Sequence, residues 1–323
     1  MDKDSIRNIV AQFPTKSAAI LSQFIDGYRT AAGEISDPLL MQFLTLALEQ
    51  TRNPFTFKAH HTKVRSPTDY YRFGTDFLRP LIDLNHSQVH GIEVLDTIQK
   101  QLLRKENVIL LANHQTETDP QALSILLENT HPAIGEHVTY VAGERVVTDP
   151  LAIPFSMGCD LLCIYSKRYI DSPPELKMDK LLHNKRTMEL MSQQLKQGGQ
   201  IIYVAPSGGR DRRNEQGVVE VAPFDAQSIE MFYLMARKAK TPTHFYPLTL
   251  STYDLLPPPV AIQKELGERR IASRCAIAIA IAPSFDMEKF PGSEDNDKLQ
   301  RRQARASALW NIVNTNYARI HPQ

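Results

Sequence analysis

The sequence predicts an α/β fold, a mixed and mostly parallel sheet flanked by helices, with a small N-terminal helical bundle. Up to about residue 80, apolar residues recur at helical spacing. Beyond residue 85, short apolar runs alternate with longer amphipathic stretches. Strands separated by helices are typical of parallel sheets. We therefore expect a helical domain over residues 1–80 and an α/β domain over residues 81–323.

The first 80 residues carry helical patterns but no recognisable chemical motif. Apolar side chains recur at helical spacing over 17–29, 39–49 and 67–84. Asp37 followed by Pro38 is typical of a helix start, with Asp37 as the N-cap. Gly74 and Pro80 interrupt the third pattern. We expect this region to serve packing and contacts with partners.

Short apolar runs and amphipathic stretches alternate through the second region. The expected strands are 108–112, 138–142, 161–165, 200–205, 245–250 and 274–282. The expected helices are 92–103, 120–128, 179–196 and 225–238. Ligands of open α/β sheets bind beyond the carboxyl ends of strands. The residues that directly follow these strands are therefore the candidates for a site.

Composition excludes several classes of protein. The chain has 323 residues, with 37 Lys and Arg against 36 Asp and Glu, so a general nucleic-acid binder is not expected. Cys159, Cys163 and Cys275 lack metal-ligand spacing and indicate reduced thiols, and we expect no metal site. No apolar run approaches the ~18 residues of a membrane helix. We expect a soluble protein without a signal peptide. If its substrate is lipid-like, the protein meets that substrate on a soluble carrier or at a membrane surface.

A histidine and an aspartate follow the strand expected at 108–112. His114 lies in the loop, and Asp119 precedes a helix that begins at Pro120. If Asp119 folds back onto one imidazole nitrogen, it fixes the tautomer and leaves the other nitrogen to take a proton. An alcohol that attacks a thioester needs such a base, and the carboxylate stabilises the imidazolium. The alternative is that Asp119 and Pro120 only start a helix, with His114 in a turn.

Basic residues follow two other strands. The loop after 200–205 reads Pro-Ser-Gly-Gly-Arg-Asp-Arg over 206–212, and its glycines allow a ligand to approach the backbone. Arginine offers a planar fork that matches phosphate oxygens. We expect one phosphate to be clamped by four residues: Lys167, Arg168, Arg210 and Arg212. The alternative is a solvated basic loop that pairs with Asp211 and Glu215.

The surroundings of Ser207 disfavour two other kinds of site. No Gly-Lys-Ser/Thr follows at the spacing of a nucleotide-binding P-loop. Ser207 also lacks the preceding glycine of a nucleophile elbow. A hydrolase would need such an elbow or a metal cluster, so that class is disfavoured. A non-catalytic protein that binds a phosphorylated metabolite stays open.

The two loops together resemble the glycerophosphate acyltransferase superfamily, whose mark is a His, four residues and an Asp. The nearer likeness is to the soluble glycerol-3-phosphate acyltransferases of plastids and of bacteria related to that lineage. The likeness extends over residues 85–285. Its blocks in this sequence are 113–120, 140–146, 206–212, 222–225, 247–248 and 256–259.

The resemblance implies transfer of a fatty-acyl group to the sn-1 hydroxyl of glycerol 3-phosphate, which gives 1-acyl-sn-glycerol 3-phosphate in the first step of phospholipid synthesis. The donor would be an acyl-carrier-protein or CoA thioester, with no further cofactor. Phosphate-binding roles are implied for Arg210 and Arg212. The family's Lys-His pair falls on Arg168 and Tyr169, so Tyr169 departs from the pattern. A related acceptor such as 1-acyl-glycerol 3-phosphate stays open.

The resemblance also bears on location and partners. Since no transit peptide is visible, we expect a protein of the bacterial cytoplasm, or of the plastid stroma if the chain is a mature plant protein. Peripheral membrane contact is expected. Five basic residues are candidates to meet an acidic acyl-carrier protein, or else belong to ordinary solvated helix faces: Lys185, Arg186, Arg237, Lys238 and Lys240.

Overall fold

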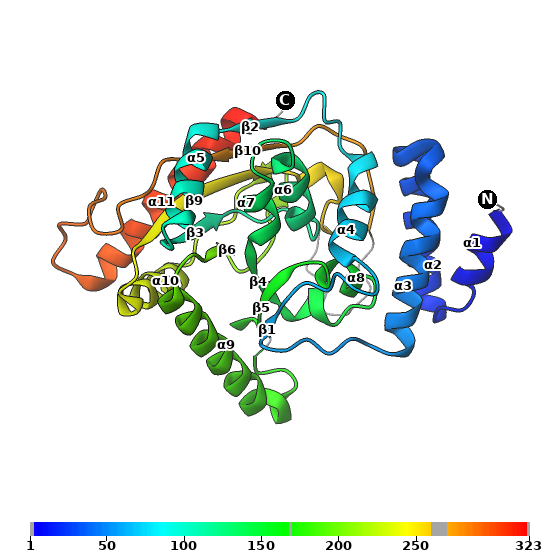
Figure 1. Ribbon diagram of the computed structural model, residues 1–323, viewed down its shortest axis with the longest axis horizontal. Coiled ribbons are helices and arrows are strands. Elements are labelled where there is room, and N and C mark those ends of the chain that lie inside the picture. The colour runs from blue at the N-terminus through cyan, green and yellow to red at the C-terminus, as the bar shows by residue number, and fades with distance from the viewer. Residues whose placement is uncertain (1–2, 168–169, 260–269, 322–323) are drawn as a thin grey trace.

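The computed structural model describes residues 3–167, 170–259 and 270–321, and within them eight strands form one sheet (Figure 1). Their order across the sheet is β1-β5-β4-β6-β3-β9-β10-β2. The strands are β1 His60–His61, β2 Gln88–His90, β3 Asn107–Ala112, β4 Thr139–Gly143, β5 Asp160–Ile164, β6 Ile201–Val204, β9 Thr243–Ser251 and β10 Ala278–Ile281. A separate hairpin pairs β7 Arg212–Arg213 with β8 Val219–Glu220.

The centre of the sheet is parallel. Strands β5, β4, β6, β3 and β9 run in one direction, whereas β10 is antiparallel to β9 and β1 is antiparallel to β5. The predicted mixed, mostly parallel sheet is thus confirmed. Parallel neighbours present their carboxyl ends at the same edge, so the loops after β6, β3 and β9 meet there.

Helices cover both faces of the sheet. They are α1 Lys3–Val10, α2 Thr15–Ala32, α3 Ser36–Arg52, α4 Tyr70–Leu78, α5 Ile92–Leu103, α6 Asp119–Leu127, α7 Pro132–His137, α8 Ile153–Ser156, α9 Lys177–Gln197, α10 Ala226–Ala239 and α11 Lys298–Ile320. On one face Val108 and Leu110 of β3 pack with α5, α6 and α7. On the other, Ile109 and Leu111 pack with α9, α10 and α11.

The alternation along β3 explains why its whole run is apolar. Successive side chains of a strand point to opposite faces, and helices bury both faces here.

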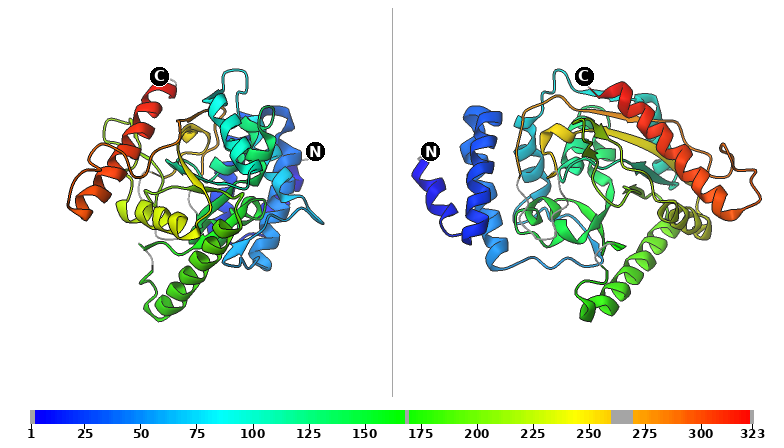
Figure 2. Two further views of the ribbon diagram at one scale, coloured as in Figure 1. Left: turned by 60° about the vertical axis from the view of Figure 1, so that its left-hand side comes forward. Right: turned by 180° about the vertical axis from the view of Figure 1, so that it is seen from behind.

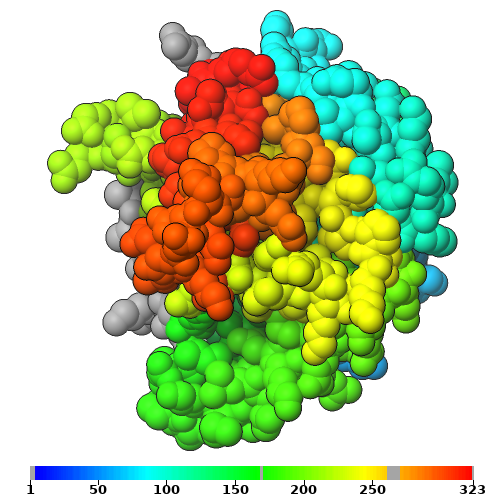
Figure 3. Space-filling view, turned by 90° about the vertical axis from the view of Figure 1, so that its left-hand side faces the viewer, coloured from blue at the N-terminus to red at the C-terminus, as the bar shows by residue number. Residues whose placement is uncertain are grey.

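Seen from behind, α11 crosses over the sheet, with α10 and α9 on the same side (Figure 2). In the space-filling view α11 and the segment before it, orange to red, lie above α9 in green (Figure 3).

The N-terminal helices α1, α2 and α3 lie at one end of the molecule (Figure 1). Tyr28 of α2 is fully buried and donates a hydrogen bond to the carbonyl of Phe77 at 2.7 Å. The same apolar cluster includes Ala122 and Ile125 of α6, and β1 of this region pairs with β5. The proposed boundary at residues 80 and 81 stays a prediction.

Several expected elements differ from the structure. Helix α3 begins at Ser36, so Asp37 is not its N-cap; the Asp37 carboxylate instead accepts a hydrogen bond from Arg29 Nε at 2.8 Å. The pattern over 67–84 forms only α4, capped by Asp69, and a 3-10 turn over Arg79–Leu81, because proline cannot continue the backbone hydrogen bonding. The last strand is shorter than expected, and α11 was not predicted. No helix in the described ranges is long and apolar enough to cross a membrane.

Candidate active site

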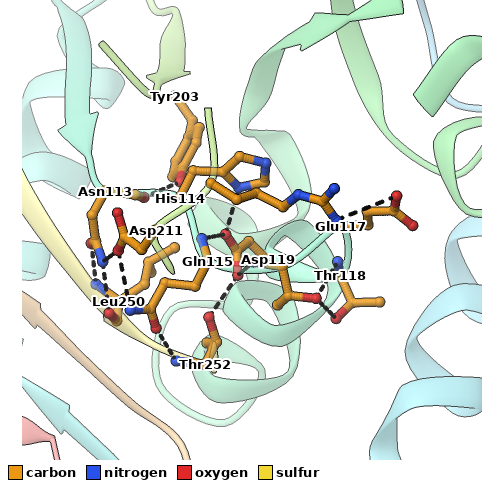
Figure 4. A network of polar contacts seen from close by, with 12 residues as sticks. Asn113, His114, Gln115, Glu117, Thr118, Asp119, Tyr203, Asp211, Leu250 and Thr252 are labelled. Carbon is orange, nitrogen blue, oxygen red and sulfur yellow. Dashed lines mark hydrogen bonds and ion pairs between the residues drawn. The ribbon is translucent and has the colours of Figure 1, made fainter. Parts of the chain in front are cut away.

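The carboxyl ends of β6, β3 and β9 bring three loops together. Leu111 of β3 lies opposite Val204 of β6 and Pro247 of β9. The chain leaves β3 into the loop that holds His114, and leaves β9 at Thr252. Figure 4 shows the side chains of these loops directed toward one another. Sequence reasoning placed the candidate residues at this edge, and the structure brings the His114 loop and the 206–212 loop into contact there.

His114 and Asp119 form a hydrogen-bonded pair. Nδ1 of His114 lies 2.8 Å from Oδ2 of Asp119 (Figure 4). The imidazole side chain is 29% exposed, whereas the aspartate side chain is 2% exposed. The contact predicted between Asp119 and one ring nitrogen is therefore present, with the ring open to solvent on one side.

The Asp119 carboxylate has further donors that fix its position. Its Oδ2 accepts the backbone N–H of Gln115 at 2.8 Å, and its Oδ1 accepts the hydroxyl of Thr252 at 2.6 Å. The backbone N–H of Thr116 adds a longer bond of 3.3 Å to Oδ1. These donors come from the loop before α6 and from the end of β9. Asp119 thus holds the His114 loop in place through these hydrogen bonds. It is the first residue of α6, whose N-cap is Thr118.

This arrangement suits His114 to accept a proton. A neutral ring that donates its Nδ1–H to a carboxylate keeps the lone pair of Nε2 as an acceptor. The carboxylate then stabilises the imidazolium that forms when Nε2 takes a proton. The pair can therefore deprotonate an alcohol that reaches the exposed side of the ring.

A cluster of amides surrounds Asp211 on one side of His114. The Asp211 side chain is fully buried, and its Oδ2 accepts hydrogen bonds from Asn113 Nδ2 at 2.8 Å and Gln115 Nε2 at 3.1 Å. Its Oδ1 accepts the backbone N–H of Ala222 at 2.9 Å. Burial raises the pKa of Asp211 to about 6, although the three N–H donors oppose the shift. The alternative of a solvated basic loop paired with Asp211 does not describe this carboxylate, which contacts neutral N–H donors.

A cluster of charges surrounds Glu117. Arg270 donates from Nε to Glu117 Oε2 at 3.0 Å, and its Nη2 lies 2.9 Å from Asp149 Oδ2. Nη1 of Arg210 lies 3.6 Å from Glu117 Oε1. Burial alone would raise the pKa of Glu117, but Arg270 and Arg210 hold it below its usual value. These four side chains are largely buried, so their charges interact strongly.

The phosphate-binding candidates lie in different surroundings. Arg210 joins the charge cluster beside the His114 loop, as described above. Arg212 lies in β7 and donates a hydrogen bond to the carbonyl of Pro259. Lys167 is exposed and lies 3.4 Å from Asp225 Oδ2, and the backbone N–H of Asp225 donates to the Pro206 carbonyl at 3.2 Å. Lys167 therefore lies near the start of the glycine loop. Arg168 and Tyr169 lie outside the described residues.

Comparison with known proteins identifies the family. The acyltransferase family model matches residues 86–251, which contain the His114 loop, the 206–212 loop and β9. Two chloroplastic glycerol-3-phosphate acyltransferases of Cucurbita moschata are 37% and 38% identical over 315 residues, which is 95% of this chain and 68% and 70% of theirs. The chloroplastic glycerol-3-phosphate acyltransferase of Arabidopsis thaliana is 36% identical over 315 residues, 95% of this chain and 68% of that protein. The chain belongs to the glycerol-3-phosphate acyltransferase family.

Membership of the glycerol-3-phosphate acyltransferase family confirms the resemblance drawn from the two loops. The chain is thus an acyltransferase. The likeness does not assign roles to single residues, so the roles of His114, Asp119 and the basic residues stay predictions. What the structure adds for this acyltransferase is the contact between the motif histidine and the motif aspartate.

Some residues of the acyltransferase site escaped sequence reasoning. Thr252 directly follows β9, so the rule that located His114 could have found it. Glu117 lies inside the motif itself, between His114 and Asp119. Arg270 is 153 positions beyond Glu117, and nothing local in the sequence indicates that the two meet.

Cysteine or metal chemistry has no visible support in the described part of this acyltransferase. Burial raises the pKa of Cys159, Cys163 and Cys275 to about 12, so none is poised as a thiolate. All three are free thiols. The described ranges contain no cluster of His, Cys, Asp and Glu that could hold a metal ion.

Proposed function

We propose that this chain transfers a fatty-acyl group from a thioester to the sn-1 hydroxyl of glycerol 3-phosphate and so forms 1-acyl-sn-glycerol 3-phosphate. The observation that carries the proposal is the His114–Asp119 hydrogen bond of 2.8 Å, beside the loop that holds Arg210. The names of its relatives support glycerol 3-phosphate as the acceptor.

The proposed reaction passes through a complex of both substrates without an acyl-enzyme. Nε2 of His114 takes the proton of the sn-1 hydroxyl as its oxygen attacks the thioester carbonyl carbon. The tetrahedral intermediate collapses, the carbon–sulfur bond breaks, and the thiolate takes the proton back from the imidazolium. Asp119 stabilises the imidazolium while it exists.

Arg210 and Arg212, with Lys167 and Arg168 as further candidates, are proposed to hold the phosphate. The Asp211 side chain between the two arginines points inward, whereas Arg210 is turned toward Glu117 and Arg212 toward the Pro259 carbonyl. A Cβ built at Gly208 or Gly209 would meet no atom within 4 Å, so a ligand has room beside this backbone. Fixing both ends of the acceptor contributes several kcal/mol by positioning.

The donor and setting are proposed on chemical grounds. An acyl-carrier-protein or CoA thioester supplies the acyl group, and the reaction as written needs no other cofactor. The chloroplast names of the relatives favour a plastid-type setting, with the bacterial cytoplasm as the alternative. Exposed basic residues of α9, of α10 and of the C-cap of α10 are proposed to meet an acidic carrier protein: Lys185, Arg186, Arg237, Lys238 and Lys240. Peripheral contact with a membrane stays a proposal.

An acceptor panel tests the function. Purified protein is supplied with acyl-carrier-protein and CoA thioesters and with glycerol 3-phosphate, 1-acyl-glycerol 3-phosphate or glycerol, and the product is analysed for the acylated position. We expect the highest kcat/KM with glycerol 3-phosphate and acylation at sn-1. Higher kcat/KM with 1-acyl-glycerol 3-phosphate would assign the alternative acceptor. Binding of glycerol 3-phosphate without any thioester turnover would indicate a non-catalytic binding protein.

A further inference from the structure

Asp211 connects the two loops of the site. It lies between Arg210 and Arg212 in the sequence, yet its own side chain is turned into the interior and fully buried. A buried carboxylate is costly unless its lone pairs are occupied. Because the side chain is buried, it does not contribute to the charge of the protein surface, and its role lies in its contacts inside the protein.

The contacts of Asp211 reach three consecutive residues of the other loop. Its backbone N–H donates to the His114 carbonyl at 2.6 Å. Its carboxylate accepts from the side chains of Asn113 and Gln115, which flank His114 (Figure 4). One residue of the arginine loop thus holds the side chains on both sides of His114 as well as the backbone carbonyl of His114 itself.

The same amides extend the connection to β9. Asn113 Oδ1 accepts the backbone N–H of Leu250 at 2.7 Å, and Gln115 Oε1 accepts the backbone N–H of Thr252 at 2.7 Å. The Thr252 hydroxyl in turn donates to Asp119. Asp211 therefore belongs to a continuous network that includes the partner of the imidazole.

The groups around the Asp211 carboxylate are all N–H donors, so its oxygens act as acceptors. Asn113 and Gln115 each use the side-chain oxygen for backbone N–H groups of β9 and the following turn, so only their N–H₂ groups face Asp211. The Ala222 backbone contributes a third N–H. Three N–H donors point at the two oxygens of Asp211. A carboxylate can accept all three hydrogen bonds, whereas the N–H₂ group of a side-chain amide can accept none.

We infer that Asp211 is a positioning residue that sets the distance between the His114 base and the Arg210–Arg212 phosphate clamp. This inference rests on the proposed function. An acceptor held at its phosphate reaches His114 only if the two loops are correctly spaced. A displacement of about 1 Å in such a site lowers the rate by roughly 10²-fold.

The ratio of two acceptors tests this inference. Glycerol lacks the phosphate and can adjust to the imidazole, whereas glycerol 3-phosphate is fixed at both ends. In Asp211→Asn we expect kcat/KM for glycerol 3-phosphate to fall about 10²-fold and kcat/KM for glycerol to change far less. The preference for glycerol 3-phosphate, which is the ratio of its kcat/KM to that of glycerol, therefore falls sharply. A purely structural role would lower both values together, since the ratio does not depend on how much of the enzyme is folded.

Asp160→Asn is the matched control. Asp160 is a half-buried carboxylate at the start of β5, at the other end of the strands, and pairs with Lys63 Nζ at 2.6 Å. Its replacement costs stability without touching the two loops, so the acceptor preference should stay at the wild-type value. If Asp211→Asn does not fold, Gln115→Met is the second variant: at similar size it removes one donor to Asp211 together with the acceptor of the Thr252 and Tyr253 N–H groups, and its preference should fall in the same direction.

The outcomes separate the two proposals. Wild-type protein that fails to acylate glycerol 3-phosphate removes the proposed function. Wild-type protein that prefers glycerol 3-phosphate, together with folded Asp211→Asn or Gln115→Met of unchanged preference, overturns the positioning role of Asp211 and leaves the proposed function standing.

Discussion

Two carboxylates lie near His114, the largely buried Glu117 in the same loop and the fully buried Asp211 in the arginine loop, and their surroundings are opposite. Glu117 is surrounded by the guanidinium groups of Arg270 and Arg210, whereas Asp211 is surrounded by neutral N–H groups. The pKa of Glu117 accordingly lies below its usual value, and burial raises that of Asp211 to about 6. In the cluster around Glu117, opposite charges balance one another close to the proposed phosphate site. The second holds backbone segments in place.

The two carboxylates should therefore respond differently to a small displacement of their partners. Charged partners tolerate small shifts because Coulomb attraction falls slowly with distance, whereas hydrogen bonds weaken steeply when misaligned. We therefore expect replacements around Glu117 to change the binding of a charged acceptor and the stability. Replacements around Asp211 should change the geometry at the imidazole.

Replacement of His114, which lies between the two clusters, should have the largest effect. His114→Ala removes the proposed base, so turnover falls about 10²–10⁴-fold, while the dissociation constant of glycerol 3-phosphate stays near the wild-type value. Steady-state kinetics and calorimetric titration measure the two quantities. Near-normal turnover would remove the general-base role.

His244→Ala is the control for this variant. His244 is 30% exposed and lies 2.7 Å from Glu106 Oε2, so it matches the exposure and the carboxylate contact of His114. It lies near the amino end of β9, away from the site. Its replacement should leave turnover unchanged.

Arg270→Gln breaks the charge cluster at its centre. Glu117 and Asp149 then keep their buried charges with less compensation, so the free energy of unfolding should fall by about 3–5 kcal/mol. Urea denaturation followed by circular dichroism measures the change. A loss below about 1 kcal/mol would show that water or other side chains compensate the two carboxylates.

Arg210→Ala removes a proposed phosphate ligand from the same cluster. Each lost hydrogen bond to a charged group costs about 1.5–3 kcal/mol, so the dissociation constant of glycerol 3-phosphate should rise by roughly 10- to 150-fold. Arg213→Ala is the control, because Arg213 is exposed and pairs with Asp254 at 2.7 Å. An unchanged dissociation constant in Arg210→Ala excludes this residue from the clamp.

A pH series compares the two carboxylates directly, since each comparison involves one ionisation. The pKa of Asp211 is raised in the folded state, so between about pH 6 and pH 4 the folded protein takes up a proton that the unfolded chain does not. Wild-type protein should therefore gain stability relative to Asp211→Asn as pH falls through this window.

Glu117 should give the opposite sign. Its pKa is lowered in the folded state, so its stabilising contribution is present at neutral pH and is lost as pH falls below its ordinary value of 4.5. Relative to Glu117→Gln, wild-type protein should lose stability on acidification. Urea unfolding of the three proteins from pH 7.5 to pH 3 measures both trends. If both stability differences change in the same direction on acidification, the two carboxylates do not differ as described.

The sequence predicted the parts of the fold and site that depend on local pattern. The bounds of α5 agree with the prediction, and Asp119 meets His114 because only four residues separate them. Helix α11 was missed although its buried residues, such as Leu309 and Val313, lie on one helical face. That signal was present in the sequence.

The remaining parts depend on which loops meet in space. Arg270 reaches Glu117 from far along the chain, and no pattern around either residue indicates the contact. Asp211 between two arginines suggested an ion pair on a solvated loop. Its burial depends on the amides of Asn113 and Gln115, whose direction is fixed by the backbone of β9.

If His114 and the arginine loop act on one small acceptor, a crystal structure with bound glycerol 3-phosphate will show both contacts. We expect the phosphate to lie against Arg210 and Arg212, with the sn-1 oxygen within about 2.6–3.2 Å of His114 Nε2. A phosphate bound elsewhere, or an sn-1 oxygen beyond reach of the imidazole even when a donor analogue is also bound, would contradict this expectation.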